Sequence, residues 1–96
     1  MTMPKYGAAT DANQQEIVDA LRKIGCTVLV IGRPLDLLVG LRKRNFLFEV
    51  KRANVSPSQK KKTKAQREFF KTWEGQARIV ETAEEAIRVV TKSYRL

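Results

Sequence analysis

The organisation of this chain follows from the stretch PLDLLVGLRKRNFLFEVK, residues 34–51. Two apolar runs flank a cluster of polar and basic residues, a pattern typical of two β-strands joined by a turn. We expect the strands at residues 35–40 and 46–51 and the turn at residues 41–45. The stretch therefore predicts an antiparallel hairpin near the middle of the chain.

Strand parity decides which side chains of this hairpin share a face, because side chains two apart on a strand point the same way. Phe46 and Phe48 would lie on one face of the second strand, and Glu49 and Lys51 on the other. If the turn passes through residues 42 and 43, residues whose numbers sum to 85 lie opposite each other. Asp36 then faces Glu49.

The rest of the chain predicts three helices and two further strands. Asp11 with Gln14 as capping partner indicates the start of the first helix, and Gly25 its end. Strands are expected at residues 26–31 and 76–81, and a loop at residues 52–62. The second helix covers residues 63–73 and is closed by Gly75, and a capping box at residues 82–85 opens the last helix. The element order is α-β-β-β-α-β-α, an α/β fold with a mixed central sheet flanked by helices.

The composition favours one domain that binds a polyanion. The 96 residues include 19 Lys or Arg against 10 Asp or Glu, a net charge of +9 with a pI near 10.1. Such an excess suits DNA, RNA or an anionic membrane surface. The apolar runs are far shorter than the roughly 20 residues that span a bilayer, and residues 1–10 lack the apolar core of a secretory signal. We therefore expect DNA, and no membrane, as the partner.

Cysteine and histidine usage excludes several function classes. Cys26 is the single cysteine, so no internal disulfide forms; we expect a small buried hydrophobe and an intracellular protein. The chain has no histidine, which excludes Ser-His-Asp and Cys-His nucleophilic sites and HExxH zinc sites. Catalysis would have to use carboxylates, lysine and a hard metal ion.

The predicted pairing of Asp36 with Glu49 suits such a metal ion. Cross-strand side chains have Cβ atoms about 5 Å apart, so two carboxylates placed there repel and need a compensating cation. Mg²⁺ binds through one or two carboxylates together with waters and substrate phosphate. Lys51, on the same face, would hold the attacking water or balance charge on the phosphate. The alternative is that Glu49 and Lys51 form an ordinary ion pair on a solvated sheet face.

These residues resemble a known signature. Pro34 and Asp36, followed by the run from Phe48 to Lys51, are similar to the PD-(D/E)xK nuclease motif, although Leu35 separates the proline and aspartate that adjoin in the family pattern. Residues 62–66, 73–75, 78–80 and 82–86 resemble the VRR-NUC branch of that superfamily, which includes small phage and bacterial nucleases similar in fold to Holliday-junction resolvases. The resemblance covers roughly residues 14–90.

The resemblance implies a restriction-endonuclease-like domain over residues 11–96. From the sequence itself we expect residues 1–10 to form a flexible arm before it. It makes Asp36 and Glu49 ligands of Mg²⁺ or Mn²⁺, with the Val50 carbonyl as a third ligand and Lys51 as the catalytic lysine. It also implies a cytoplasmic protein encoded by a bacterium or phage and acting as a homodimer.

Two helix residues gain roles from the same resemblance. Glu16 matches the family's early acidic residue, which coordinates the metal or its waters, and Gln66 matches the glutamine that braces the lysine and the water. From the residues alone, each is equally well interpreted as a solvent-facing polar position on a helix.

The basic residues predict contacts with phosphates. Residues 51–67 contain seven Lys or Arg and no acid, and residues 42–44 form a second cluster; a merely solubilising loop is the alternative. The residues expected to bind nucleic acid are Arg42, Lys43, Arg44, Arg52, Lys60, Lys61, Lys62, Lys64 and Arg67. Phosphate contacts carry no sequence information, so we expect recognition of DNA shape.

Phe69, Phe70 and Trp73 recur at helical spacing. Core packing is the favoured interpretation of this stripe, and stacking on bases the alternative.

The leading hypothesis is a metal-dependent endonuclease that hydrolyses phosphodiester bonds in branched or junction DNA. A non-catalytic nucleic-acid-binding module of the same fold is the main alternative, and a basic protein that binds an acidic protein partner is a third. The grouping of Asp36, Glu49 and Lys51 favours the enzyme, because binding of a polyanion gains nothing from acids in a basic surface.

Overall fold

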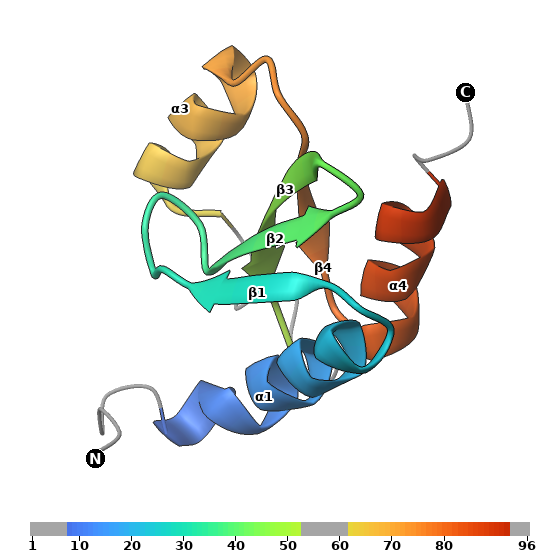
Figure 1. The fold of residues 1–96 in the computed structure, drawn as a ribbon. Helices are drawn as coiled ribbons and strands as arrows, with labels where there is room; N and C mark the ends of the chain where they lie inside the picture. The colour runs from blue at the N-terminus through green and yellow to red at the C-terminus, as the bar shows by residue number, and fades with distance from the viewer. Residues whose placement is uncertain (1–7, 53–61, 93–96) are drawn as a thin grey trace.

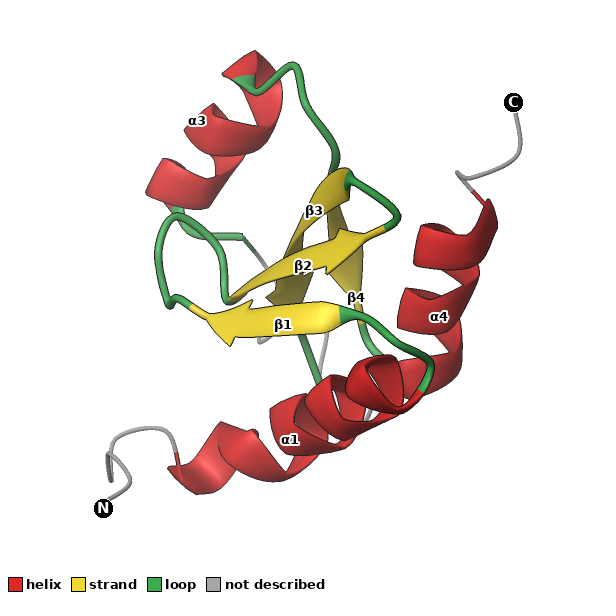
Figure 2. Cartoon of the chain, viewed as in Figure 1, coloured by secondary structure: helices red, strands yellow, loops and turns green. Residues whose placement is uncertain are grey.

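The computed structural model describes residues 8–52 and 62–92, and it has the expected element order (Figures 1 and 2). The helices and strands are α1 (Ala8–Lys23), β1 (Thr27–Val30), β2 (Leu37–Leu41), β3 (Arg44–Val50), α3 (Lys64–Thr72), β4 (Ala77–Val80) and α4 (Ala83–Lys92). Within these described ranges no helix is long and apolar enough to cross a membrane.

The four strands form one mixed sheet in the order β1-β2-β3-β4. The β1–β2 and β2–β3 pairs are antiparallel, and β3 and β4 are parallel, joined by a crossover that contains α3. In the β2–β3 pair Leu37 lies opposite Phe48 and Leu41 opposite Arg44. The predicted register, in which paired numbers sum to 85, is therefore confirmed.

The turn between β2 and β3 sets this register. Arg42 and Lys43 have φ angles of 53° and 70°, the left-handed conformation that a tight two-residue hairpin needs to match the strand twist. This conformation costs about 1 kcal/mol or more at each non-glycine residue. The five residue pairs between β2 and β3 offset that cost, and a slip by one residue would move every core side chain of the slipped strand to the opposite face.

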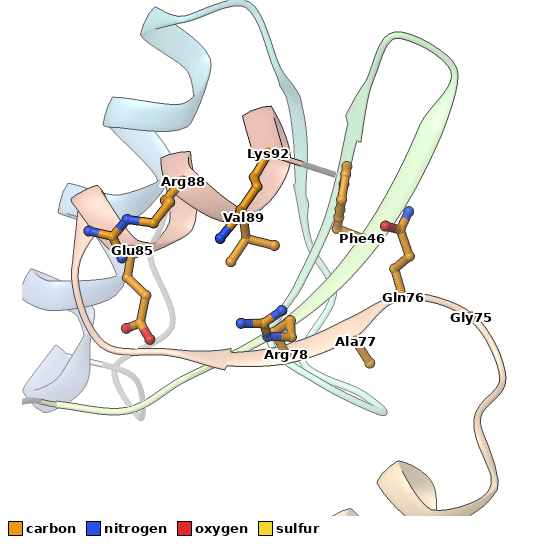
Figure 3. A pocket seen from close by; sticks show the side chains of 9 residues that line it. All are labelled: Phe46, Gly75, Gln76, Ala77, Arg78, Glu85, Arg88, Val89 and Lys92. Carbon is orange, nitrogen blue, oxygen red and sulfur yellow. The ribbon is translucent and has the colours of Figure 1, made fainter. Parts of the chain in front are cut away.

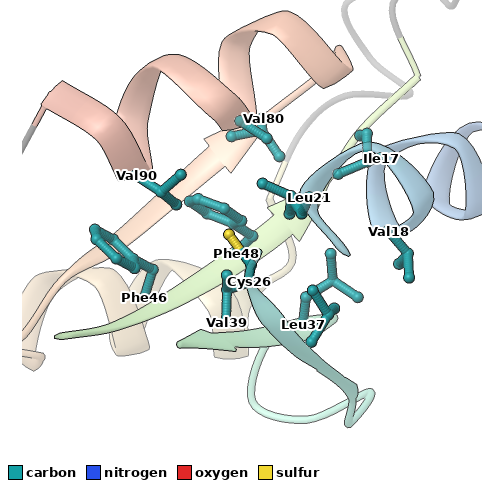
Figure 4. Close-up of a cluster of buried hydrophobic side chains, with 12 residues drawn as sticks. Ile17, Val18, Leu21, Cys26, Leu37, Val39, Phe46, Phe48, Val80 and Val90 are labelled. Atoms are coloured by element: carbon teal, nitrogen blue, oxygen red, sulfur yellow. The ribbon is translucent and has the colours of Figure 1, made fainter. Parts of the chain in front are cut away.

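The core lies between the sheet and the helices α1 and α4 (Figure 4). Phe46 and Phe48 point into it from β3, with ring centroids 6.2 Å apart, so the predicted parity of this strand is confirmed. Cys26 is buried in the same cluster, as expected for a structural cysteine, and burial raises the pKa of its thiol. The other buried members are Ile17, Val18, Leu21, Val28, Leu37, Val39, Val80, Ala86 and Val90.

The helix α3 lies away from this core, on the other side of the sheet from α1 and α4 (Figures 1 and 2). No α3 residue is buried, and Trp73, which follows the helix, is 46% exposed. The prediction that Phe69, Phe70 and Trp73 pack in the core is therefore wrong. Helical periodicity marks an apolar stripe but does not show what covers it, and here α1 and α4 already occupy the core face of the sheet.

Two expected element ends are also wrong, the start of the first helix and the end of the second. The helix α1 begins at Ala8, three residues before the expected start at Asp11. Residues 8–10, assigned to the arm, are helical, and residues 1–7 lie outside the described ranges. Alanines favour helix strongly enough to extend it past a potential cap. The helix ends at Lys23, close to the predicted Gly25, whose φ of 106° suits glycine. Gly75 does not close α3, because the N–H of Trp73 caps it by donating to the Phe69 carbonyl.

Candidate active site

Asp36 is held immediately before β2. Its backbone carbonyl accepts hydrogen bonds from the N–H groups of Ile31 (2.9 Å) and Gly32 (3.2 Å), which close the loop between β1 and β2. Its carboxylate Oδ2 accepts a hydrogen bond of 2.8 Å from the Val50 N–H on β3. Extending the strand register by one residue beyond Leu37 and Phe48 places Asp36 across from Glu49, as predicted.

Glu49 is the one buried charged residue among those that the structure describes, with 6% of its surface exposed. Its Oε2 accepts a hydrogen bond of 2.6 Å from the Gln66 side-chain amide and lies 3.3 Å from the Lys51 Nζ. The Lys51 side chain is itself only 15% exposed. This ion pair is therefore shielded from solvent, unlike the ordinary surface pair that was the alternative interpretation.

The two carboxyls perturb each other. Burial raises the pKa of Asp36, and the Val50 N–H, the Lys51 charge and a hydrogen bond with the Glu49 carboxyl act against it. Burial and then the Asp36 charge raise the pKa of Glu49, and the contacts with Gln66 and Lys51 oppose that rise. Both pKa values lie above their usual range, so the pair would be stabilised by an added cation.

Gln66 is oriented by the start of α3. Its side-chain oxygen accepts a hydrogen bond of 3.1 Å from the Thr63 N–H, while the Thr63 hydroxyl accepts one of 3.1 Å from the Gln66 N–H. This is a capping box, in which both partners satisfy backbone donors at the helix end. Because the oxygen of Gln66 is used in the cap, its NH₂ group faces Glu49. The sequence assigned Gln66 to the site, and the structure places it there through this cap.

Asn13 is a site residue that the sequence did not single out. Its side-chain NH₂ group donates to the Lys51 carbonyl (3.1 Å) and the Glu81 carbonyl (3.2 Å), at the ends of β3 and β4. These bonds join α1 to the backbone of Lys51. A single asparagine on a helix gives no signal in sequence, because its partners are 38 and 68 residues away.

The oxygen atoms around the acid pair suit a hard divalent metal. In an antiparallel pair the N–H and C=O of one residue point to the same edge of the strand. Because the Val50 N–H points to Asp36, the Val50 carbonyl lies on that edge as well. The two carboxylates and this carbonyl make up the hard oxygen ligand set that Mg²⁺ and Mn²⁺ prefer.

Glu16 is not brought into this group. It is exposed on α1, one turn after Asn13. Within residues 8–52 and 62–92, no three acidic, cysteine or histidine side chains come close enough together to hold a metal ion. The structure therefore brings Asp36 and Glu49 together without the third acid that the sequence had assigned to them.

The basic residues fall into two separate places. Arg52 follows Lys51 directly, and Lys62, Lys64 and Arg67 lie at the start of α3, where Gln66 contacts Glu49; the Arg67 guanidinium donates to the Lys62 carbonyl at 3.0 Å. Lys60 and Lys61 lie outside the described residues.

The second cluster, Arg42, Lys43 and Arg44, lies at the hairpin turn. Arg44 is five residues before Glu49 on β3, roughly 16 Å away at the rise of a strand. These residues are therefore at the far end of the hairpin from the acid pair.

A hollow of about 430 Å³ lies between β4 and α4 (Figure 3). Phe46 lines it, so it opens on the core face of the sheet, whereas Glu49 points to the other face. Its charged side chains are Arg78, Arg88, Lys92 and one acid, Glu85. Without a second acid this hollow is not the candidate active site.

Comparisons of the chain with protein-family models, with curated proteins and with solved structures found no match.

Proposed function

We propose that this protein is a metal-dependent DNA endonuclease that hydrolyses phosphodiester bonds, and that it prefers branched or junction DNA. The observation that carries the proposal is the acid pair: the buried Glu49 on β3 and the half-buried Asp36 across from it, with Lys51 Nζ 3.3 Å from Glu49. Two neighbouring carboxylates whose pKa values are raised by burial destabilise a protein unless a cation is bound between them, so their presence favours a functional metal site. The resemblance to the PD-(D/E)xK signature, VRR-NUC branch, supports the same activity.

In this proposal Asp36, Glu49 and the Val50 carbonyl hold Mg²⁺ or Mn²⁺. The metal, when bound, activates water and stabilises charge on the phosphate. Lys51 lies beside the carboxylates and supplies a positive charge to the phosphate oxygens. Gln66 fixes the Glu49 carboxylate, and Asn13 fixes the backbone carbonyl of Lys51. Glu16 has no assigned role in this proposal.

The substrate follows from charge. The net charge of +9 favours a polyanion. Arg52 follows Lys51, and Lys64 and Arg67 lie on either side of Gln66 in the sequence, so we expect these cations to contact phosphates. We expect contacts to the DNA backbone and to DNA shape, since phosphate contacts carry no sequence information.

We also propose that the protein acts as a homodimer. The edge strand β1 exposes Leu29 and Val30, which are 53% and 58% exposed. An apolar edge strand readily pairs with another chain. Sedimentation equilibrium should give twice the monomer mass, and a Leu29→Lys variant should give the monomer mass.

The second candidate function is a nucleic-acid-binding module without catalysis. The observation that favours it is that the described residues offer two acids, and no third, at the site. One assay separates the two functions. Branched, duplex and single-stranded DNA are incubated with the protein in Mg²⁺, Mn²⁺, Ca²⁺ or excess chelator.

The endonuclease should cut in Mg²⁺ and Mn²⁺, bind without efficient cutting in Ca²⁺, and leave DNA intact in chelator, because Ca²⁺ prefers more ligands at longer distances. Lys51→Ala should abolish cutting, and Lys23→Ala, which removes the same charge at an exposed position in the last turn of α1, should preserve it. DNA that is bound but intact under every metal condition would establish the binding module instead.

A further inference from the structure

Three aromatic side chains at the α3 helix contact one another. Phe69 and Trp73 stack with ring centroids 5.2 Å apart and an interplanar angle of 22°, and Phe70 meets Phe69 edge to face at 6.0 Å. We call Phe69, Phe70 and Trp73 the aromatic stripe. Phe69 and Phe70 are half-buried, and Trp73 is 46% exposed. The helix that carries Phe69 and Phe70 lies on the side of the sheet away from α1 and α4 (Figure 1).

The aromatic stripe is continuous with the candidate active site. Its members follow Gln66 by three, four and seven residues, so all four share one face along the helix axis. Gln66 donates to Glu49, which fixes the near end of the stripe at the acid pair. At 1.5 Å per residue, Trp73 lies about 10 Å farther along this axis. That is the length of about three stacked nucleotides at roughly 3.4 Å each.

Positive charge lies near the stripe. The Lys62 ammonium sits over the Phe70 ring, 4.9 Å from its centroid. Lys64, Arg67 and Lys71 lie on the opposite face of the same helix, together with one acid, Glu68. Two copies of such a helix would repel each other if they met face to face, whereas a polyanion would be attracted. The combination of aromatic rings with flanking cations is the arrangement by which proteins bind single-stranded nucleic acid, because every base offers a π-face.

We infer that the aromatic stripe binds unpaired bases of a single-stranded DNA segment, two to four nucleotides from the phosphate at the acid pair. The inference rests on the proposed function for the position of that phosphate, and it adds a class of substrate: DNA in which a single strand leaves the duplex near the cut. Trp73 is the principal stacking residue, with Phe70 beside it. Bases held in a duplex are already stacked and cannot use this surface.

The test measures binding in chelator, so that it does not depend on cleavage. Trp73 is the single tryptophan of the chain, and its fluorescence should be quenched when bases stack on it. Anisotropy gives the Kd for a labelled 12-nucleotide single strand and for a blunt duplex of the same length. Trp73→Ala should weaken single-strand binding roughly 5- to 150-fold and change duplex binding less than about twofold. Trp73→Phe should retain most of the affinity, and Thr72→Ala, an exposed neighbour on the same helix, all of it.

Abasic nucleotides locate the contact. On a strand anchored by a duplex junction, an abasic position two to four nucleotides from the junction should reproduce the loss and remove the quenching, and one at eight nucleotides should not. If Trp73→Ala lost equal affinity for the single strand and for the duplex, or lost no affinity at all, the inference would be overturned. So would a concentration-dependent dimer that Trp73→Ala converts to monomer, since the stripe would then be an interface between copies. A protein that never cuts but shows quenching and strand preference would refute the nuclease and leave this inference standing.

Discussion

Replacing Asp36 with Asn should stabilise the protein in chelator at neutral pH while abolishing cleavage. The side-chain oxygen of asparagine can still accept the hydrogen bond from the Val50 N–H, so the local geometry is kept. What disappears is the half-buried negative charge beside the buried Glu49 carboxylate. Binding of DNA in chelator should stay equal or become tighter, because that charge also repels phosphate.

The magnitude follows from the pairing geometry. Opposed side chains on neighbouring strands have Cβ atoms about 5 Å apart, and two unit charges at that distance repel by about 3 kcal/mol at an effective dielectric constant near 20. The Lys51 ammonium, 3.3 Å from Glu49, offsets part of this repulsion. We therefore expect a gain of roughly 1–2 kcal/mol, which is about 4–16 °C in the Tm of a domain of this size.

The gain in stability of Asp36→Asn over the parent should depend on pH, and it should grow as pH rises. The pKa of Asp36 is raised in the folded state above its usual value of 3.8. The folded state thus binds the proton of Asp36 more tightly than the unfolded state does. The stability that this proton contributes to the parent protein is fully present below pH 3.8 and is lost as pH rises through the folded-state pKa. Metal-free parent protein should lose stability across that range, and Asp36→Asn should lose less.

Thermal unfolding in chelator from pH 3.5 to pH 8, with a second series in Mg²⁺ at neutral pH, measures both effects. Mg²⁺ should raise the Tm of the parent and leave that of Asp36→Asn nearly unchanged. Asp19→Asn is the matched control, because it makes the same change at an exposed side chain whose acceptor role, toward Gln15 at 2.8 Å, an amide can keep. If Asp36→Asn had a lower Tm than the parent at neutral pH, or if Asp19→Asn raised the Tm equally, the idea that Asp36 and Glu49 repel each other would be refuted.

Three further results are expected. Gln66→Ala should lower the cleavage rate about 10- to 100-fold, because the Glu49 carboxylate is released. Thr63→Ala removes only the helix cap, so it should cost about 1 kcal/mol of stability and much less activity. Equal losses of activity in the two variants would assign Gln66 to the helix cap only. Asn13→Ala should lower the free energy of unfolding by about 1–3 kcal/mol, measured by urea titration, because two backbone carbonyls lose their donor. Replacing Lys64 and Arg67 with Ala should reduce the slope of log K against log salt by about two, and an unchanged slope would make these cations merely solubilising.

The sequence by itself determined the hairpin and the acid pair within it. The alternation of apolar residues in β3, the polar turn and the fixed period of two along a strand were enough to place Phe46 and Phe48 in the core and Asp36 opposite Glu49. These predictions succeed because every contact is local or follows from pairing two adjacent strands. The element order and the mixed sheet could be predicted for the same reason.

Only the tertiary structure decided which helices cover the core and which residues join the site from a distance. The apolar stripe of α3 has the same periodicity as a core helix, yet α1 and α4 fill the core face of the sheet and leave Trp73 in solvent. Asn13 reaches Lys51 across 38 residues, while Glu16, three residues later, stays exposed. Periodicity gives the direction of a side chain relative to its own helix, but its partner depends on where the crossover and the sheet place that helix.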